Sequence, residues 1–302
     1  MKSKTLSKFS EEIIVQLLSV GKIRTAETYR VSIRSFLCFR KGEDLPFDAL
    51  TSDLMQAYEG YLSTRGNCPN TTSFYMRNLR AIYNRAVECG LTAQHYPFRH
   101  VYTGVDRTIK RAISHSALRS IVSLDLKGES SLQFARDMFL FSFYTRGMSF
   151  VDMAYLRKSD LRNGILTYRR RKTQQQLIIH WEPCMQQIVE HYANPESPYL
   201  LPIINPALPI DSRQQYIYSA HKVNRSLKQI GERLGLPLPL TMYVSRHSWA
   251  SIAKSQNVPL SIISEAMGHD SESTTRIYLA SLDTVAVDRA NRKILMLITN
   301  NS

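Results

Sequence analysis

Apolar residues recur at helical spacing along most of this chain, and this period constrains the fold more than any other feature of the sequence. In the first hundred residues, three such segments follow polar start signals at Thr25, at Thr51-Ser52-Asp53 and at Pro69-Asn70. Two β-rich runs, Ile165–Tyr168 and Leu177–Trp181, break this pattern and flank a polar, basic tip. We therefore expect a mainly α fold with a small antiparallel β-sheet that includes this hairpin.

The chain divides into two domains around a segment that has no clear period. Residues 99–112 contain Gly104 and the basic string Arg107-Thr108-Ile109-Lys110-Arg111, and Ser114 then gives a helix-start signal. We expect a helical domain over residues 1–98, a linker over 99–112 and a larger domain over 113–302. A chain of 302 residues is long enough for each domain to bury its own core.

The charge balance indicates a polyanionic partner. Lys and Arg number 39 against 25 Asp and Glu, a net charge of +14, and both halves of the chain are basic. Duplex DNA, with about one charge per 1.7 Å of its axis, is the obvious candidate. RNA-binding proteins share such a balance, so the charge gives a class of partner and not an activity.

Three arginines on one segment suggest where this partner binds. Arg77, Arg80 and Arg85 lie on the helical segment after Pro69, away from its apolar positions. Any one of them is ordinarily part of a solvated helix face. As a group, and together with Lys110 and Arg111 in the linker, they predict a surface that contacts phosphates.

Cysteine usage and hydropathy limit the compartment and the bound groups. Cys38, Cys68, Cys89 and Cys184 are scattered, without metal-ligand spacing, so we interpret them as free thiols rather than disulfides or zinc ligands. No apolar run approaches the roughly 20 residues that span a bilayer, and the first residues lack the pattern of a secretory signal. The sequence predicts a cytoplasmic protein without membrane contact.

Three local clusters carry residues suited to chemistry on a phosphate. They are Tyr144–Leu161, the hairpin tip and the run from Tyr243 to Tyr278. Taken singly, each residue has an ordinary explanation, such as a surface ion pair, a solvated lysine or a core tyrosine. The candidate site residues are Arg146, Lys172, Tyr243, Arg246, His269 and Tyr278.

Taken together, these residues resemble the tyrosine recombinase (phage integrase) family. That family has, in order, an arginine, a hairpin lysine, a His-x-x-Arg box, a Leu-Gly-His box and a nucleophilic tyrosine about nine residues later. The order here is Arg146, Lys172, Tyr243-x-x-Arg246, Met267-Gly268-His269 and then Tyr278, nine residues after the histidine. The match covers roughly residues 110–285, and the first box is similar to recombinases of Bacteroidetes mobile elements.

The resemblance implies an architecture and an activity. A helical core-binding (SAM-like) domain and a catalytic domain would form a C-shaped clamp around double-stranded DNA. Tyr278 would attack a DNA phosphate, forming a 3′-phosphotyrosyl link and releasing a 5′-hydroxyl, and rejoining would integrate, excise or invert DNA. Four subunits would assemble on two specific sites by exchanging C-terminal tails, with a host DNA-bending protein as a candidate accessory partner.

Physical chemistry explains why these residue types would cooperate. Guanidiniums bind non-bridging phosphate oxygens through paired hydrogen bonds and keep their charge, which suits Arg246 first and Arg146 second. His269 could accept or steady the proton that the Tyr278 phenol must lose. By the resemblance, Lys172 would protonate the leaving 5′-oxygen. We expect no metal and no cofactor, since arginines take the role that Mg²⁺ fills elsewhere.

The chain departs from the family pattern at two positions. Tyr243 stands where the second box opens with histidine; a phenol can donate a hydrogen bond but is a poor acid at pH 7. Ser149, and not Arg146, aligns with the family's first arginine when Ala154–Leu161 is the anchor. On a helix Arg146 would lie one turn before Ser149 on the same face, so we expect its side chain to reach the same phosphate.

Two other readings stay open at this point. A type IB topoisomerase shares this catalytic set and would relax plasmids that lack a specific site. A DNA-binding protein with impaired catalysis is the second, and Ser149 is the residue that favours it. A generic RNA-binding protein explains none of the ordered boxes.

Overall fold

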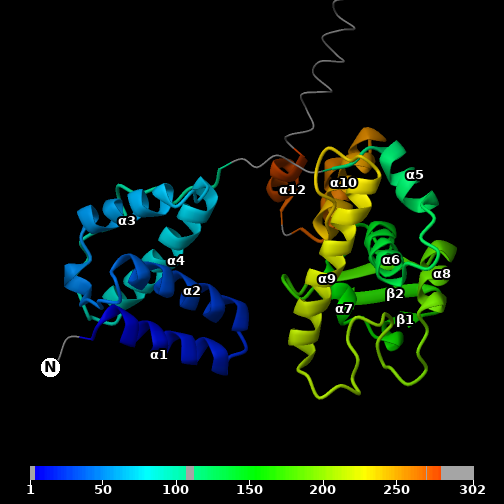
Figure 1. Cartoon of the computed structure of the whole chain (residues 1–302). Helices are drawn as coiled ribbons and strands as arrows, with labels where there is room; N and C mark the ends of the chain where they lie inside the picture. The colour runs from blue at the N-terminus through cyan, green and yellow to red at the C-terminus, as the bar shows by residue number, and fades with distance from the viewer. Residues whose placement is uncertain (1–3, 107–111, 270, 280–302) are drawn as a thin grey trace, which may run out of the picture. The chain divides into compact units, whose positions relative to one another are not determined.

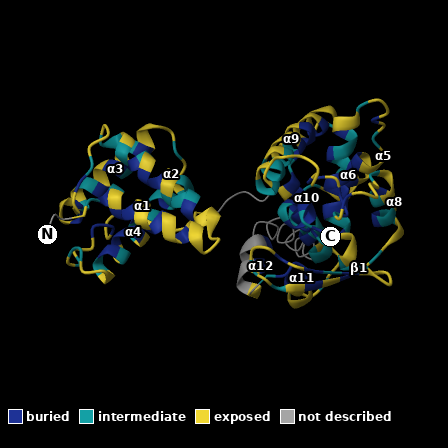
Figure 2. Cartoon of the chain, turned by 90° about the horizontal axis from the view of Figure 1, so that it is seen from below, coloured by how far each residue is buried: buried dark blue, intermediate teal, exposed yellow. Residues whose placement is uncertain are grey.

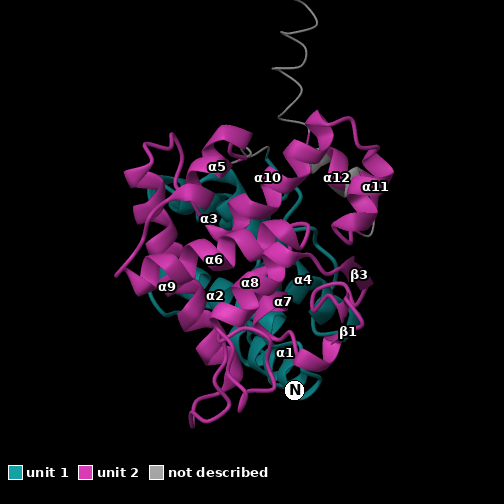
Figure 3. Ribbon diagram, turned by 90° about the vertical axis from the view of Figure 1, so that its right-hand side faces the viewer, with its two compact units in different colours: residues 1–108 teal, residues 109–302 magenta. Residues whose placement is uncertain are grey.

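The computed structural model describes residues 4–106, 112–269 and 271–279, with only the backbone described at Ser273, Thr274, Ile277 and Tyr278. The chain forms two compact units, residues 1–108 and residues 109–302 (Figure 3). Within the described ranges no helix combines the length and the apolar character that crossing a membrane requires. The mainly α fold with a small antiparallel sheet is confirmed. The clamp prediction concerns the placement of the two units and stays a prediction.

The first unit is helical and encloses an apolar core. Its core includes aromatic contacts such as the edge-on pair of Phe36 and Tyr58, whose ring centroids lie 5.1 Å apart. Thr51 caps its helix as predicted, its hydroxyl accepting from the Leu54 N–H at 3.2 Å. The elements are α1 (Leu6–Ser19), α2 (Ile23–Phe39), the 3₁₀ turn η1 (Phe47–Ala49), α3 (Ser52–Thr64) and α4 (Pro69–Glu88) (Figure 1).

The predicted start of the second helix at Thr25 is wrong. Helix α2 begins at Ile23 with Lys22 as its N-cap, because Gly21, at φ +72°, already reverses the chain after α1. Thr25 therefore lies inside the first turn of the helix.

The second unit is built around helix α6 (Ser130–Tyr144). Leu132, Met138, Phe139 and Phe141 of this helix are buried, and α6 packs against α8, α9 and α10 (Figure 2). Its first helix begins at the predicted Ser114, whose hydroxyl accepts from the Ala117 N–H at 3.1 Å. The other helices are α5 (His115–Ser123), α7 (Phe150–Ala154), the 3₁₀ turn η2 (Lys158–Asp160), α8 (Pro183–His191), α9 (Ser212–Arg233), α10 (Met242–Ser255), α11 (Leu260–Ala266) and α12 (Glu272–Leu279).

A three-stranded antiparallel sheet lies against this core, in the order β1 (Leu161–Arg162), β2 (Ile165–Arg169) and β3 (Gln176–His180). The β2–β3 hairpin is the predicted one, in a register that pairs Leu166 with Ile179. The Asn163-Gly164 turn, with positive φ at both residues, joins β2 to the short β1, which the sequence analysis did not anticipate. Side chains alternate between buried and exposed along β2 and β3, so every second residue faces the core.

Helices α10, α11 and α12 share a small apolar cluster of their own. Ala250, Ile263, Met267 and Leu279 are all buried in it. This cluster fixes the backbone of α12, which carries Tyr278, against the helix that carries Arg246. The predicted C-terminal tail after Tyr278 lies outside the described residues, since the description ends at Leu279.

Candidate active site

Arg246 lies at the centre of the site and is held by main-chain carbonyls. It stands in the second turn of α10, and only 8% of its surface is exposed. Its Nη1 donates to the carbonyl oxygen of Gly147 at 2.7 Å, and its Nη2 donates to that of Met267 at 2.6 Å. Nη2 also lies 2.9 Å from Nε2 of His269. The guanidinium is therefore preorganised between the loop after α6 and the end of α11.

Gly147 lets the loop after α6 approach Arg246 this closely. A Cβ at this position would lie 2.8 Å from Cα of Arg246, nearer than non-bonded atoms approach. The backbone here also has φ +76°, which favours glycine. Contact with Arg246 therefore requires the absence of a side chain at residue 147.

His269 is neutral in this site. Burial lowers its pKa from 6.5 to about 4, and the positive charges of Arg246, Arg170 and Lys172 add to this effect. Its Nδ1 lies 2.7 Å from Oγ1 of Thr275 on α12, so both ring nitrogens have partners. The ring can act as a hydrogen-bond partner or a base, but it adds no charge at neutral pH.

Arg170 is a second buried guanidinium that the sequence analysis missed. It follows β2 directly, is 8% exposed, and its Nη1 donates to the carbonyl oxygen of Gly268. Gly268, at φ +62°, leaves room for it, because a Cβ there would lie 2.7 Å from Cδ of Arg170. Strand alternation was the available signal: Leu166 and Tyr168 face inward, so residue 170 continues the inward side.

Asp152 is the counter-ion that anchors Arg170. Its carboxylate is 4% exposed, and Oδ2 lies 4.0 Å from Nε of Arg170. Oδ2 also accepts from the Ser149 hydroxyl at 2.6 Å, while Oδ1 accepts from the Arg171 N–H at 2.9 Å. Ser149 thus caps α7 and supports Asp152, at the position where the family pattern has an arginine.

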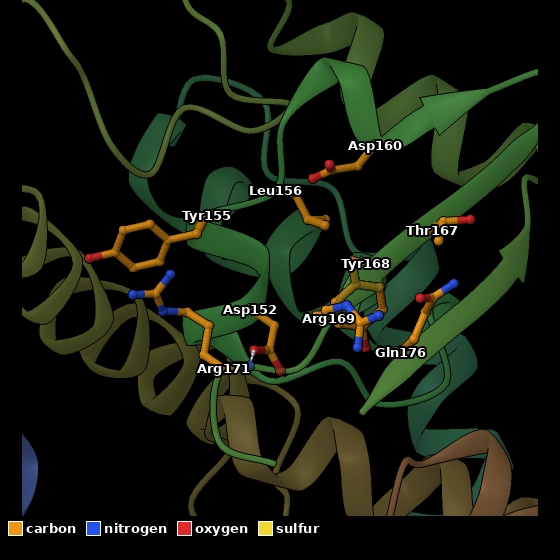
Figure 4. A pocket seen from close by; sticks show the side chains of 9 residues that line it. All are labelled: Asp152, Tyr155, Leu156, Asp160, Thr167, Tyr168, Arg169, Arg171 and Gln176. Carbon is orange, nitrogen blue, oxygen red and sulfur yellow. Dashed lines mark hydrogen bonds between the residues drawn. The ribbon is translucent and has the colours of Figure 1, made fainter. Parts of the chain in front are cut away.

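A pocket of about 310 Å³ opens beside Asp152 and is lined by residues of α7 and of the β2–β3 hairpin. Figure 4 shows Arg169 and Arg171 at its wall, with the hydrogen bond from Arg171 to Asp152 drawn as a dashed line. The guanidinium of Arg171 lies over the ring of Tyr155, 3.9 Å from its centroid. Arg169 and Arg171 therefore line this pocket. Arg170, between them in the chain, instead contacts Gly268, the residue before His269.

The helical argument for Arg146 is wrong. Helix α6 ends at Tyr144, and Arg146 has φ +61° in the left-handed turn that precedes α7. Gly147 bonds back to Ser142, which ends the helix, so Arg146 and Ser149 do not share a helix face. The guanidinium of Arg146 donates instead to the carbonyl oxygen of Ile178 at 3.3 Å.

Arg146 nevertheless stays near the buried arginines. Burial raises the pKa of the Tyr168 phenol, and the charges of Arg170, Arg246 and Arg146 act against that rise. Three guanidiniums therefore lie close enough for their charges to act on one buried phenol. Two of them, Arg246 and Arg170, also act on His269.

The remaining candidates lie at the edges of the site. Lys172 is exposed in the turn between β2 and β3, where its charge acts on His269. Tyr243, 58% exposed, packs its ring edge-on against His247 at 4.3 Å between centroids. Tyr278 lies in α12, three residues after Thr275, and its side chain is outside the described part.

The predicted surface in the first unit is less uniform than the sequence analysis expected. Arg77 is exposed, whereas Arg80 and Arg85 are half-buried. Arg80 donates to Oγ1 of Thr103 at 3.1 Å, and Arg85 to Oε1 of Gln16 at 2.8 Å. Lys110 and Arg111 lie outside the described residues, so the phosphate-contacting surface stays a prediction.

The arrangement is suited to holding an anion. Two desolvated guanidiniums flank a neutral imidazole, with a lysine on the adjoining turn. In a partly buried site such charges act more strongly on a bound phosphate than they would in water. Their fixed contacts also mean that little reorganisation is needed when the anion arrives.

Comparison with family models gives two matches that together span most of the chain. A model described as "Phage integrase SAM-like domain" matches residues 5–101, and one described as "Phage integrase family" matches residues 111–284. A search of curated proteins finds no match.

Solved structures of similar fold include integrases. A fragment of lambda integrase, solved as a dimer bound to a COC′ core site, has a TM-score of 0.69 at 16% identity, over 91% of this chain and 95% of that one. Lambda integrase as a tetramer bound to a Holliday junction has a TM-score of 0.68 at 16% identity, over 92% and 78%. The Tn1549 transposon integrase in complex with transposon right end DNA has a TM-score of 0.67 at 15% identity, over 95% and 99%.

Proposed function

Because the chain belongs to the phage integrase family and is a site-specific tyrosine recombinase, we propose that it breaks and rejoins DNA strands through Tyr278. The observation that carries the assignment of the site is the cluster of buried Arg246 and Arg170 with half-buried His269, which Thr275 joins to the helix of Tyr278. Integrases of the same fold were solved in complex with DNA, and we propose that this chain binds DNA as well.

In the first step the phosphate enters between Arg246 and Arg170. Its non-bridging oxygens take hydrogen bonds from guanidinium groups that now donate to the carbonyl oxygens of Gly147 and Gly268. Both arginines keep their charge as negative charge grows on the phosphate, so they stabilise the transition state more than the ground state. Arg170 takes the role that the sequence analysis gave to Arg146.

In the second step the Tyr278 oxygen attacks phosphorus and the bond to the 5′-oxygen breaks. The phenol loses its proton as the new bond forms, and His269, a neutral ring, accepts it through Nε2 once the phosphate has taken over the Arg246 N–H that Nε2 now binds. Lys172 protonates the leaving 5′-oxygen. The bond energy is kept in the 3′-phosphotyrosine, so attack by a 5′-hydroxyl reverses the steps and needs neither a nucleotide nor a metal ion.

Tyr243 takes a positioning role at the rim of this cluster. Tyr243 is 58% exposed, and a phenol hydroxyl can donate a hydrogen bond to a DNA phosphate.

Assembly follows from the reaction, since recombination cuts strands on two duplexes. We infer a homotetramer on DNA, in which the apolar residues 294–298 of each tail dock on a neighbouring subunit. A host protein that bends the sites would assist, and the reaction would take place in the cytoplasm. A variant ending at residue 282 should then bind one site but fail to bring two sites together in sedimentation on DNA.

A nicked duplex tests the central proposal, because loss of the short strand after cleavage traps the covalent protein–DNA adduct. Wild type should form the adduct, and Tyr278→Phe should not, while both bind the DNA equally. An adduct with the phenylalanine variant would show that another residue is the nucleophile.

A further inference from the structure

Thr275 links the nucleophile helix to the histidine of the site through a polar contact. Its side chain is fully buried (0% exposed), and its Oγ1 lies 2.7 Å from Nδ1 of His269. On the opposite side of the ring, Nε2 lies 2.9 Å from Nη2 of Arg246. The imidazole is thus held between the hydroxyl of α12 and the guanidinium of α10.

These two contacts determine which ring nitrogen carries the proton. A guanidinium has N–H groups only and cannot accept a hydrogen bond. The bond from Arg246 therefore requires a lone pair on Nε2, so a neutral ring carries its proton on Nδ1. That N–H then donates to the hydroxyl oxygen of Thr275, which is the acceptor the tautomer needs.

The position of Thr275 in the chain links this tautomer to the nucleophile. Tyr278 follows Thr275 by three residues, close to one turn of the same helix α12. Apolar packing of Leu279 with Ala250, Ile263 and Met267 holds that helix to α10 and α11. Apolar packing tolerates small slides along the helix, whereas a hydrogen bond to one ring nitrogen accepts a narrow range of distance and angle. The Thr275 bond therefore sets where α12 rests relative to the histidine.

We propose that Thr275 is a positioning residue for the reaction: it gives the Nδ1–H of His269 its acceptor, which supports the tautomer that the Arg246 bond requires, and it brings Tyr278 into register with that ring. The inference rests on the proposed function, since it concerns the delivery of the same nucleophile. Thr275 itself touches no reacting atom and acts through His269.

Two substitutions separate the hydroxyl from the shape of the side chain. Thr275→Val keeps the branched, buried volume and removes the acceptor, which leaves the Nδ1–H without a partner from this residue. Thr275→Ser removes a methyl group and keeps the hydroxyl. A matched control is Ser251→Ala on α10, which removes a helix hydroxyl that donates to the carbonyl oxygen of His247 at 2.8 Å.

The first measurement is ¹⁵N NMR of full-length, histidine-labelled protein without DNA. Wild type and Thr275→Ser should show His269 as the Nδ1–H tautomer, with a slowly exchanging ring proton. Thr275→Val should lose the slow exchange of that proton, because its Nδ1–H no longer has the Thr275 hydroxyl as its acceptor. A His269 spectrum that is unchanged in the valine variant would overturn the proposal.

The second measurement is the single-turnover rate of adduct formation on the nicked duplex. Thr275→Val should be slower by roughly 10- to 100-fold, the cost of one unsatisfied buried donor, with DNA binding unchanged. Thr275→Ser should stay within a few-fold of wild type, as should Ser251→Ala. Equal losses in the valine and serine variants would show that packing and not the hydroxyl matters, which contradicts the proposal.

The two measurements distinguish a failure of the proposed function from a failure of the proposed role of Thr275. If wild type forms no adduct, the proposed function is wrong, yet the NMR comparison still decides whether Thr275 is the acceptor of the His269 ring proton. If wild type forms the adduct and the valine variant matches its rate, the proposed function stands and the role of Thr275 is refuted.

Discussion

Replacing Arg170 by lysine tests a residue that is absent from the sequence-based candidates but lies buried beside Gly268 in the structure. The substitution keeps the positive charge beside Asp152 but removes the planar fork. A single ammonium group cannot hydrogen-bond to the Gly268 carbonyl oxygen, pair with the Asp152 carboxylate and also bind a phosphate through two parallel N–H groups. Loss of one preorganised donor at a reacting centre costs about 10²–10³ in rate, or about 3–4 kcal/mol of transition-state stabilisation.

Lysine is a sharper test than alanine because of burial. Arg170→Ala would leave the carboxylate of Asp152 without its cation, and breaking a buried pair costs about 3–5 kcal/mol of folding free energy. The Ser149 hydroxyl and the Arg171 N–H would still solvate that carboxylate, so we expect the lower end of the range. An alanine variant would therefore confuse instability with lost catalysis.

The assay is single-turnover cleavage of the nicked duplex at saturating protein, with urea unfolding as the check on folding. Arg169→Lys is the matched control: it is the exposed neighbour on β2, and its side chain donates to the Gln174 carbonyl. We expect it to cleave at the wild-type rate. Arg146→Lys should lose less than tenfold. If Arg170→Lys keeps full activity while Arg146→Lys loses it, the assignment of Arg170 is refuted and the original one is restored.

Three further predictions follow from the same contacts. Gly147→Ala should lower the free energy of unfolding of the larger unit by about 2–4 kcal/mol in urea, because of left-handed strain and the clash with Arg246. The control Gly235→Ala, at φ +61° in open space, should lower it by only about 1 kcal/mol. Equal losses would show that the close approach of Gly147 to Arg246 is unimportant. The pKa of His269 is lower in the folded protein than in the unfolded chain, so its contribution to stability is present above pH 6.5 and is lost as the pH falls toward about 4. His269→Gln should therefore reduce the loss of stability between these pH values in acid unfolding. A curve identical to that of wild type would contradict a neutral His269 ring in the folded protein. Chelation of divalent metal ions should leave adduct formation unchanged, and a loss that Mg²⁺ restores would contradict catalysis by arginines alone.

Local sequence signals predicted helix starts and strands correctly where the interaction joins residues that are close in the chain. The caps at Thr51 and Ser114 form the hydrogen bonds that their side chains suggest, and the hairpin has the strands expected from its β-rich runs. The Thr25 cap failed because a tighter signal, the glycine turn at residue 21, starts the helix earlier.

The wrong expectation of a helix through Arg146 and Ser149 has the same origin. Its three-residue spacing from Ser149 was interpreted with a helical period, but the chain leaves the helix at Thr145 and enters a left-handed turn. A period applies only while the helix continues. The alternation along β2 already pointed to Arg170, and only the contact of the hairpin end with Gly268 shows what that inward side chain meets.

The sequence by itself determined the family, the order of the boxes and the nature of the reacting groups, because spacing along the chain and the chemistry of side chains are local properties. Tertiary structure alone decided which arginine accompanies Arg246, which carboxylate balances it and which hydroxyl orients His269. These pairings join residues far apart in sequence, such as Arg170 with Gly268 and Arg246 with Gly147. They exist because close packing lets two glycines approach two buried cations, and no local pattern encodes that approach.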